Sequence, residues 1–248
     1  MNRSRATFLA TLCVIGLFSA EGAFAQQEDR WRFGVGTGIS SFSLDGDIGV
    51  ATSQGGVIDD IDLDNSETMD LIQSGIGGAL FARKGPWTIN LRVANFTLED
   101  SDADVDYEWD NVLAESTVVY NFATTGNHRW GVLGGVRYIE HQWDITTATE
   151  SLDPEDDWTD LVVGMTHAVP LAARWSWSNR VDYGFGESEG VWSAETSVNW
   201  QPFDHWLFNL GFTWFSAEFN DEGDVDQPDF YFYDVDQPAF RLGFLYLW

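Results

Sequence analysis

Seven charged residues recur at positions where a folded chain could pair them away from water. Each alternates with uncharged neighbours, so a strand would carry it on the face opposite to those neighbours. The seven are Arg92, Glu115, Arg137, Arg180, Asp182, Glu195 and Arg241. An unpaired buried charge is costly, and the planar guanidinium fork of arginine can hold two carboxylate oxygens. We therefore predict one interior network of these residues, which either fills the interior for stability or lines a conducting or catalytic lumen.

A second set of charges is wholly acidic and alternates with uncharged residues. It comprises Asp60, Asp62 and Asp64 in one run and Asp102, Asp104 and Asp106 in another. This spacing aligns carboxylates on one face of a strand, where they could bind Ca²⁺ or Mg²⁺ or concentrate cations at a pore mouth. A solvated, mutually repelling surface is the simpler interpretation, because no calcium loop with its glycine and terminal glutamate is present. The six residues are thus weak metal candidates, and no other cofactor is expected.

Alternating strands must position both sets of charges. From Gln26 onward the chain shows no helical periodicity of useful length. Four short connections alternate with five acidic, often longer ones, which predicts ten strands, or eight if two of them belong to a long hairpin. The predicted strands are 30–44, 68–83, 87–99, 107–122, 129–143, 158–171, 174–187, 191–201, 205–219 and 237–248. The predicted fold is all-β, a transmembrane, antiparallel, up-and-down β-barrel with its short turns in the periplasm.

The 13 tryptophans are distributed at two levels along these strands. Most lie at the short-turn ends, and Trp109, Trp143, Trp158, Trp192 and Trp214 lie toward the loop ends. Tryptophan is enriched at both interfaces of a membrane, so we expect two aromatic girdles around the barrel. A soluble β-sandwich is the alternative, but it does not predict two levels.

The last strand has one wholly apolar face. Its outward residues are Phe240, Leu242, Phe244, Tyr246 and Trp248. A strand in lipid needs such a face, because hydrocarbon contacts it directly while polar residues face the lumen. In this ending the chain resembles bacterial outer-membrane β-barrel proteins, whose terminal strand usually ends in Phe or Trp. The resemblance implies that these five residues are the signal for the barrel-assembly machinery.

Residues 1–25 have the features of a secretory signal peptide. A charged start precedes a short apolar centre, and Ala23-Phe24-Ala25 forms a small-x-small cleavage site. Residues 26–248 are then one domain, which we expect to pass through the periplasm and insert in the bacterial outer membrane. The net charge of -28 excludes nucleic acid as a partner. The expected partners are outer-membrane lipid, lipopolysaccharide and the barrel-assembly machinery, and no oligomeric state follows from these patterns.

Short motifs across residues 26–248 extend the resemblance. They are Ser43-Leu44-Asp45-Gly46-Asp47, Arg83-Lys84-Gly85-Pro86-Trp87, Gly134-Gly135-Val136-Arg137-Tyr138, Asp157-Trp158-Thr159-Asp160 with Val163-Gly164, and Asp182-Tyr183-Gly184-Phe185-Gly186. In these motifs the chain is similar to a family of small, porin-like proteobacterial outer-membrane β-barrel proteins. The resemblance implies the fold and the location, and it brings no catalytic residues with it.

An enzyme is one alternative to a structural barrel. Some outer-membrane barrels, such as the omptin proteases and the lipid A-modifying enzymes, are enzymes, and the omptins also have ten strands. Their chemistry needs a histidine with acidic or serine partners at the outer rim. Of the four histidines, His141 alone lies near that rim, beside Glu140 and Asp144, and no matching family motif surrounds it. We therefore assign no catalytic residue.

The predicted function is that of a non-enzymatic outer-membrane barrel. It is either structural or a narrow cation-favouring channel with a lumen filled by arginines and carboxylates. Ten strands leave a lumen only modestly wider than that of an eight-stranded barrel, so large solutes should not pass. The alternatives are an enzyme acting at the outer rim, and an adhesin or divalent-cation-dependent surface-binding protein.

Overall fold

The computed structural model describes residues 30–52, 55–101, 105–147, 151–220 and 230–248. The expected signal peptide, residues 1–25, lies outside these ranges, and so do Asp102 and Asp104 of the second acidic run. The described residues form one antiparallel sheet of 13 strands and a short helix. No helix among them is long and apolar enough to cross a membrane.

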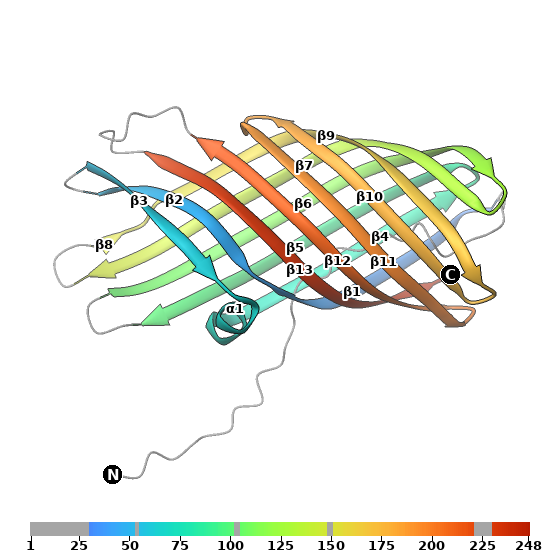
Figure 1. The fold of residues 1–248 in the computed structure, drawn as a ribbon, viewed down its shortest axis with the longest axis horizontal. Coiled ribbons are helices and arrows are strands. Elements are labelled where there is room, and N and C mark those ends of the chain that lie inside the picture. Colours follow the sequence, from blue (N-terminus) through green and yellow to red (C-terminus); the bar gives the residue numbers. More distant parts are fainter. Residues whose placement is uncertain (1–29, 53–54, 102–104, 148–150, 221–229) are drawn as a thin grey trace, which may run out of the picture.

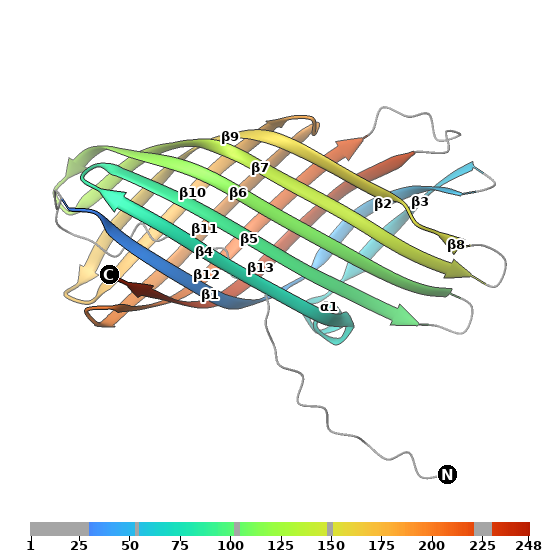
Figure 2. The same cartoon turned by 180° about the vertical axis from the view of Figure 1, so that it is seen from behind.

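Ten long strands close into a barrel (Figures 1 and 2). They are β1 (Arg32–Phe42), β4 (Ile72–Lys84), β5 (Trp87–Ser101), β6 (Val105–Thr125), β7 (His128–Thr147), β9 (Glu155–Ala172), β10 (Trp175–Gly186), β11 (Gly190–Phe203), β12 (Trp206–Asn220) and β13 (Tyr231–Leu247). Each strand pairs antiparallel with the next, and β1 pairs with both β4 and β13, which closes the barrel. The predicted ten-stranded barrel is confirmed, and the eight-stranded alternative is excluded.

Three further strands lie beyond the barrel at the long-loop end. The hairpin of β2 (Leu44–Thr52) and β3 (Gly55–Leu63) continues the sheet from β13, and β8 (Ser151–Leu152) pairs with β7. In both overall views the β2–β3 hairpin projects past the barrel wall (Figures 1 and 2). Asp60 and Asp62 therefore belong to an extended strand that runs out of the barrel, as their spacing predicted, whereas Asp64 lies beyond the end of that strand.

A short helix follows this hairpin. Helix α1 (Asn65–Leu71) is capped by Asp64, whose carboxylate accepts hydrogen bonds from the hydroxyl and backbone N–H of Ser66 and from the backbone N–H of Glu67. Those bonds, led by the Ser66 hydroxyl, hold the pKa of Asp64 below its ordinary value. The predicted strand 68–83 thus began too early, because residues 65–71 are helical. Asp64 and Glu67 form a capping box, a spacing visible in the sequence.

Tight turns join the barrel strands at the other end. Gly85 (φ 55°) and Gly126 (φ 61°) occupy the left-handed region in two such turns, where a side chain would be strained. Inside the barrel, the ring of Phe81 lies against Gly34 so closely that an added Cβ would come within 2.0 Å of it. The glycines of β1 therefore make space for large side chains on the neighbouring strands.

An apolar belt surrounds the barrel. Large hydrophobic side chains are exposed on all ten barrel strands, and those of the last strand are Phe240, Leu242, Phe244, Tyr246 and Trp248. The two polar side chains Asn179 and His167 also face outward, but they hydrogen bond to each other at 3.2 Å. Exposed apolar area on this scale is stabilised by hydrocarbon and would drive association in water. The outward placement of the five C-terminal residues agrees with the sequence, while their recognition by an assembly machinery stays a prediction.

The outer girdle differs from the prediction. Trp192 and Trp214 face outward and stack at 6.4 Å between ring centroids, and the indole N–H of Trp214 donates to Asp236. Trp109, Trp143 and Trp158 instead lie inside the barrel, between 0% and 6% exposed. The expectation that all 13 tryptophans form girdles was therefore wrong for these three. They pack against one another in the interior, where the long-loop end of the barrel would otherwise be hollow.

Candidate functional site in the barrel interior

The interior is filled by two successive layers of side chains. We call the seven charged residues Arg92, Glu115, Arg137, Arg180, Asp182, Glu195 and Arg241 the ion layer. We call the cluster nearer the long-loop end the aromatic layer; it comprises Phe96, Trp109, His141, Trp143, Trp158, Phe219, Tyr231 and Tyr233. Strand β7 carries members of both, with Arg137 first and His141 and Trp143 further toward the loop.

Strand register brings the ion layer together. On β6, Glu115 lies directly opposite Arg92 of β5 on one side and Arg137 of β7 on the other. On β10, Arg180 lies opposite Glu195 of β11. Directly opposed side chains on one face of a sheet are close enough to interact. The alternation read from the sequence therefore places these residues on the inward face, and antiparallel pairing sets them side by side.

Glu115 is the centre of the ion layer. Its two carboxylate oxygens accept from Arg92 Nη2 at 2.6 Å, Arg137 Nη2 at 2.7 Å and Arg180 Nη1 at 2.9 Å. Three guanidinium groups thus converge on a single carboxylate. Charge-assisted bonds of this length are among the strongest polar contacts in proteins.

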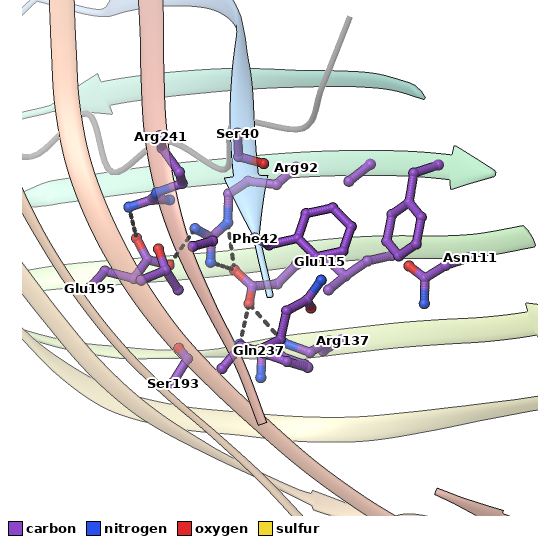
Figure 3. Close-up of a pocket in the computed structure, with 16 residues that line it drawn as sticks. Ser40, Phe42, Arg92, Asn111, Glu115, Arg137, Ser193, Glu195, Gln237 and Arg241 are labelled. Carbon is purple, nitrogen blue, oxygen red and sulfur yellow. Dashed lines mark hydrogen bonds and ion pairs between the residues drawn. The ribbon is translucent and has the colours of Figure 1, made fainter. Parts of the chain in front are cut away.

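Asp182 and Glu195 complete the ion layer. Asp182 accepts from Arg137 at 2.6 Å and from Arg180 at 2.7 Å. Glu195 accepts from Arg92 at 2.8 Å and from Arg241 at 3.3 Å, and Figure 3 shows it beside both. The Arg92–Glu195 pair joins β5 to β11 across the barrel. The structure therefore brings together all seven residues that the sequence grouped.

The ion layer is almost fully buried. Its seven residues are between 2% and 5% exposed. Desolvating so many charges is expensive, and the pairing offsets this cost without adding large net stability. Removal of one member is different, because it leaves buried partners uncompensated at a cost of about 3–5 kcal/mol. The ion layer therefore acts as a closed polar plug whose members depend on one another.

The aromatic layer closes the barrel above the ion layer. Trp109 stacks on Trp143 at 4.7 Å between centroids, and Trp158 stacks on Phe219 at 4.6 Å. Tyr231 and Tyr233 enter from the upper part of β13, which continues into the β2–β3 extension. On three strands a residue of this layer is an even number of positions from an inward charge. The pairs are Trp109 and Glu115 on β6, Trp143 and Arg137 on β7, and Trp158 and Asp160 on β9. That shared parity was the sequence signal that the layer faces inward.

His141 lies within the aromatic layer and not at a solvated rim. It is 1% exposed, and Nδ1 forms a 2.6 Å hydrogen bond with the hydroxyl of Tyr231. It lies beyond the apolar belt, because its outward neighbour on β7 is Glu140, which accepts a hydrogen bond from Tyr138. Burial lowers the pKa of His141 to about 3. The imidazole is therefore neutral at physiological pH and packed among rings, and Asp156 lies opposite it on β9.

Four acids of the β2–β3 extension, Asp45, Asp47, Asp60 and Asp62, lie on its outer face. Cross-strand register aligns Asp60, Asp47, Asp234 and Glu218 in one row, and Asp62, Asp45 and Asp236 in the next. Like charges directly opposite one another destabilise a sheet. Within the described part of the chain, no group of three or more His, Cys, Asp or Glu side chains is arranged to hold a metal ion. Of the six candidates, Asp60 and Asp62 belong to these rows, Asp64 caps α1, and Asp106 pairs with Ser101 and Thr146.

Comparisons with known proteins give the fold but no family. No protein-family model matches the chain, and a search of curated proteins finds no match. Among solved structures, the chain is similar to the outer membrane protease OmpT from Escherichia coli, with a TM-score of 0.54 and 9% identity over 93% of this chain and 100% of that one. It also matches Ail of Yersinia pestis (TM-score 0.36, 9% identity, 88% and 98% covered) and Neisserial surface protein A (TM-score 0.34, 10% identity, 91% and 99% covered). The similarity to OmpT shows that the chain has the fold of an outer-membrane β-barrel protein.

Proposed function

We propose that this chain is an integral protein of the bacterial outer membrane, and that its barrel is structural, without catalysis or conduction. The apolar belt and the shared fold with OmpT support the location. In this orientation the short turns lie in the periplasm, and the β2–β3 extension lies outside the cell. The protein then holds an acidic sheet at the cell surface.

The filled interior is the observation that carries this proposal. An ion crossing the barrel would meet the aromatic layer and then the ion layer, and both are almost fully buried. The ion layer also places four guanidinium groups on this path, which opposes the passage of cations. The cation-favouring channel is therefore the weaker interpretation.

Conductance in a planar lipid bilayer tests this proposal. We expect no single-channel steps from the purified, refolded protein, while a general porin inserted under the same conditions gives clear steps. Heat-modified migration on a denaturing gel verifies that the tested protein is folded. Reproducible, cation-preferring steps from folded protein would overturn the proposal and would support a cation channel instead.

An enzyme at the outer rim receives little support. The fold is shared with a protease, but a shared fold does not carry a function with it. His141 is the one histidine that the sequence placed near that rim, and it is neutral and enclosed in the aromatic layer. This state does not favour a catalytic role for it. Incubating the folded protein with peptide and lipid A substrates tests this point. Turnover that disappears in His141→Ala would overturn the non-enzymatic assignment.

Cation-dependent surface binding is the second candidate function. The two acidic rows support it, because they run across four strands on the outer face, with Asp47 and Asp234 at their centre. Such a face attracts divalent cations from solution, and these cations can link it to anionic lipopolysaccharide. We expect vesicles containing lipopolysaccharide to bind the detergent-solubilised protein more strongly with Mg²⁺ than in sodium chloride of equal ionic strength. Replacing Asp45, Asp47 and Asp60 by Asn should abolish the difference, and an unchanged difference would argue against this role.

A further inference from the structure

A cavity lies where the ion layer meets the aromatic layer (Figure 3). Its volume is about 70 Å³, and its lining includes Phe42, Phe96 and Phe215 on the apolar side and Arg137 and Thr213 on the polar side. One buried water needs roughly 10–15 Å³ measured in this way. The cavity therefore has room for several water-sized groups in the centre of an otherwise packed interior.

Some polar atoms of this lining lack a hydrogen-bond partner within the described residues. Arg137 Nη1 and Thr213 Oγ1 are among them, and both are buried. Arg137 uses its Nε and Nη2 atoms on Glu115 and Asp182, and the ring of Phe215 lies 5.5 Å from the centre of its guanidinium. A buried charged donor without an acceptor is costly. The cavity therefore offers two donors that an occupant with acceptor atoms would satisfy.

The charge on the unpaired donor shows which kind of acceptor fits. Arg137 carries a guanidinium cation, and hydrogen bonds between ionised partners are stronger than those to neutral ones. Asp160, the buried carboxylate opposite Arg137 on β9, hydrogen bonds to the hydroxyl and the backbone N–H of Ser188. Water would satisfy the donors of the cavity with uncharged hydrogen bonds only. A singly charged anion would give Arg137 a charge-assisted one.

We propose that this cavity binds one small monovalent anion, in the size range from chloride to acetate, between Arg137 Nη1 and Thr213 Oγ1. The carboxylates of Glu115 and Glu195, which also line the cavity, exclude a second negative charge, so phosphate and sulfate are disfavoured. The anion would give Arg137 Nη1 the acceptor that it lacks among the described residues. This site belongs to the barrel interior and does not depend on what the extracellular surface binds.

Bromide locates the anion directly, because it replaces chloride and scatters X-rays anomalously. Protein refolded and crystallised in sodium bromide should give one anomalous peak inside the barrel, within hydrogen-bond distance of Arg137 Nη1. An interior without a bromide peak, filled by water alone, would overturn the proposal. A peak that persists undiminished when Thr213 is replaced would identify an adventitious ion only and would overturn it as well.

Two threonines give a matched pair of variants for a measurement in solution. Thr213→Val removes the hydroxyl that lines the cavity, while Thr117→Val removes another buried hydroxyl without a partner that lies outside the cavity lining. The urea midpoint of the detergent-solubilised protein is measured as chloride replaces gluconate at constant ionic strength. A ligand that binds the folded state raises this midpoint. We expect a rise in the wild type and in Thr117→Val, and about tenfold weaker apparent chloride affinity in Thr213→Val, the loss of one bond to a charged group.

Equal midpoints in chloride and gluconate for the wild type would overturn the proposal. An equal loss of chloride dependence in both threonine variants would overturn it too, because the effect would then not arise in the cavity. The comparison needs no variant of the ion layer itself, so it does not depend on the folding of a barrel with an unpaired buried charge.

Discussion

The protein carries charges in two regions and arranges them in opposite ways. Inside the barrel, four arginines and three carboxylates are interleaved and buried. On the outer face of the extension, carboxylates stand in rows such as Asp60, Asp47 and Asp234, and the sequence places no lysine or arginine in the long-loop connections. The aromatic layer separates the two regions.

The difference follows from the surroundings of each region. In a low-dielectric interior each charge must be matched, because water cannot solvate it. On a wet surface, water and salt screen like charges, so rows of carboxylates cost little. Removing a charge should therefore destabilise the interior strongly and stabilise the exterior slightly. The change in the free energy of unfolding should therefore have opposite signs in the two regions, which can be tested.

The largest effect is expected from Glu115→Gln. This change keeps the shape of the side chain but removes the negative charge on which three arginines converge. We expect the free energy of unfolding to fall by about 5 kcal/mol, the upper end for a broken buried ion pair. Urea unfolding in detergent micelles, followed by tryptophan fluorescence, measures it. Glu140→Gln on the outward face of β7 is the control, and a loss below about 1 kcal/mol in Glu115→Gln would contradict the burial of the ion layer.

Trp158→Ala tests the layer that separates the two regions. Trp158 is fully buried against Phe219 and His141, whereas Trp192 is exposed on the outer surface. Truncating a buried aromatic side chain costs about 3–5 kcal/mol, so we expect about 4 kcal/mol for Trp158→Ala in the same urea titration. Trp192→Ala is the matched control and should lose far less. Equal losses at the two positions would show that Trp158 belongs to an outer girdle after all.

The two regions also differ in how far the sequence predicted them. The inward position of Arg137 followed from alternation, because a charge within an apolar strand can lie only in the lumen. Tryptophan gave no such signal, since lipid and a packed interior both accept it, and only its parity with Arg137 or Asp160 marks Trp143 and Trp158 as inward. Contacts across the barrel, such as Arg92 with Glu195, depend on strand tilt and barrel closure, which no local pattern contains.

Acid should act on the aromatic layer through His141. The pKa of this histidine is about 3 in the folded protein and about 6.5 when unfolded. The unfolded state therefore binds more protons between these values, so stability is full above about pH 6.5 and is lost as the pH falls toward 3. Near pH 5.5 the contribution should approach 1.4 kcal/mol per pH unit.

His141→Phe isolates this contribution. Urea unfolding of wild type and variant between pH 7.5 and 5.5 should show a smaller acid dependence in the variant, because phenylalanine has no proton to bind on unfolding. His205→Phe at the short-turn end is the control for histidines in general. If His141→Phe kept the full acid dependence of the wild type, His141 would be solvated, and the aromatic layer would be open to water.

The smallest effect, and the only stabilising one, is expected on the outer face. Asp47 lies between Asp60 and Asp234 in one acidic row, so Asp47→Asn removes repulsion from both sides. Cross-strand like charges cost a few tenths of a kcal/mol to about 1 kcal/mol, and we expect a gain of about 0.5 kcal/mol in urea at low salt. The gain should vanish in about 1 M sodium chloride, where screening acts within roughly 3 Å. Glu155→Gln is the control, because its cross-strand partner is the uncharged Gln142. Destabilisation by Asp47→Asn would mean that a bound cation already pairs with the row, and the contrast between interior and exterior charges would then fail.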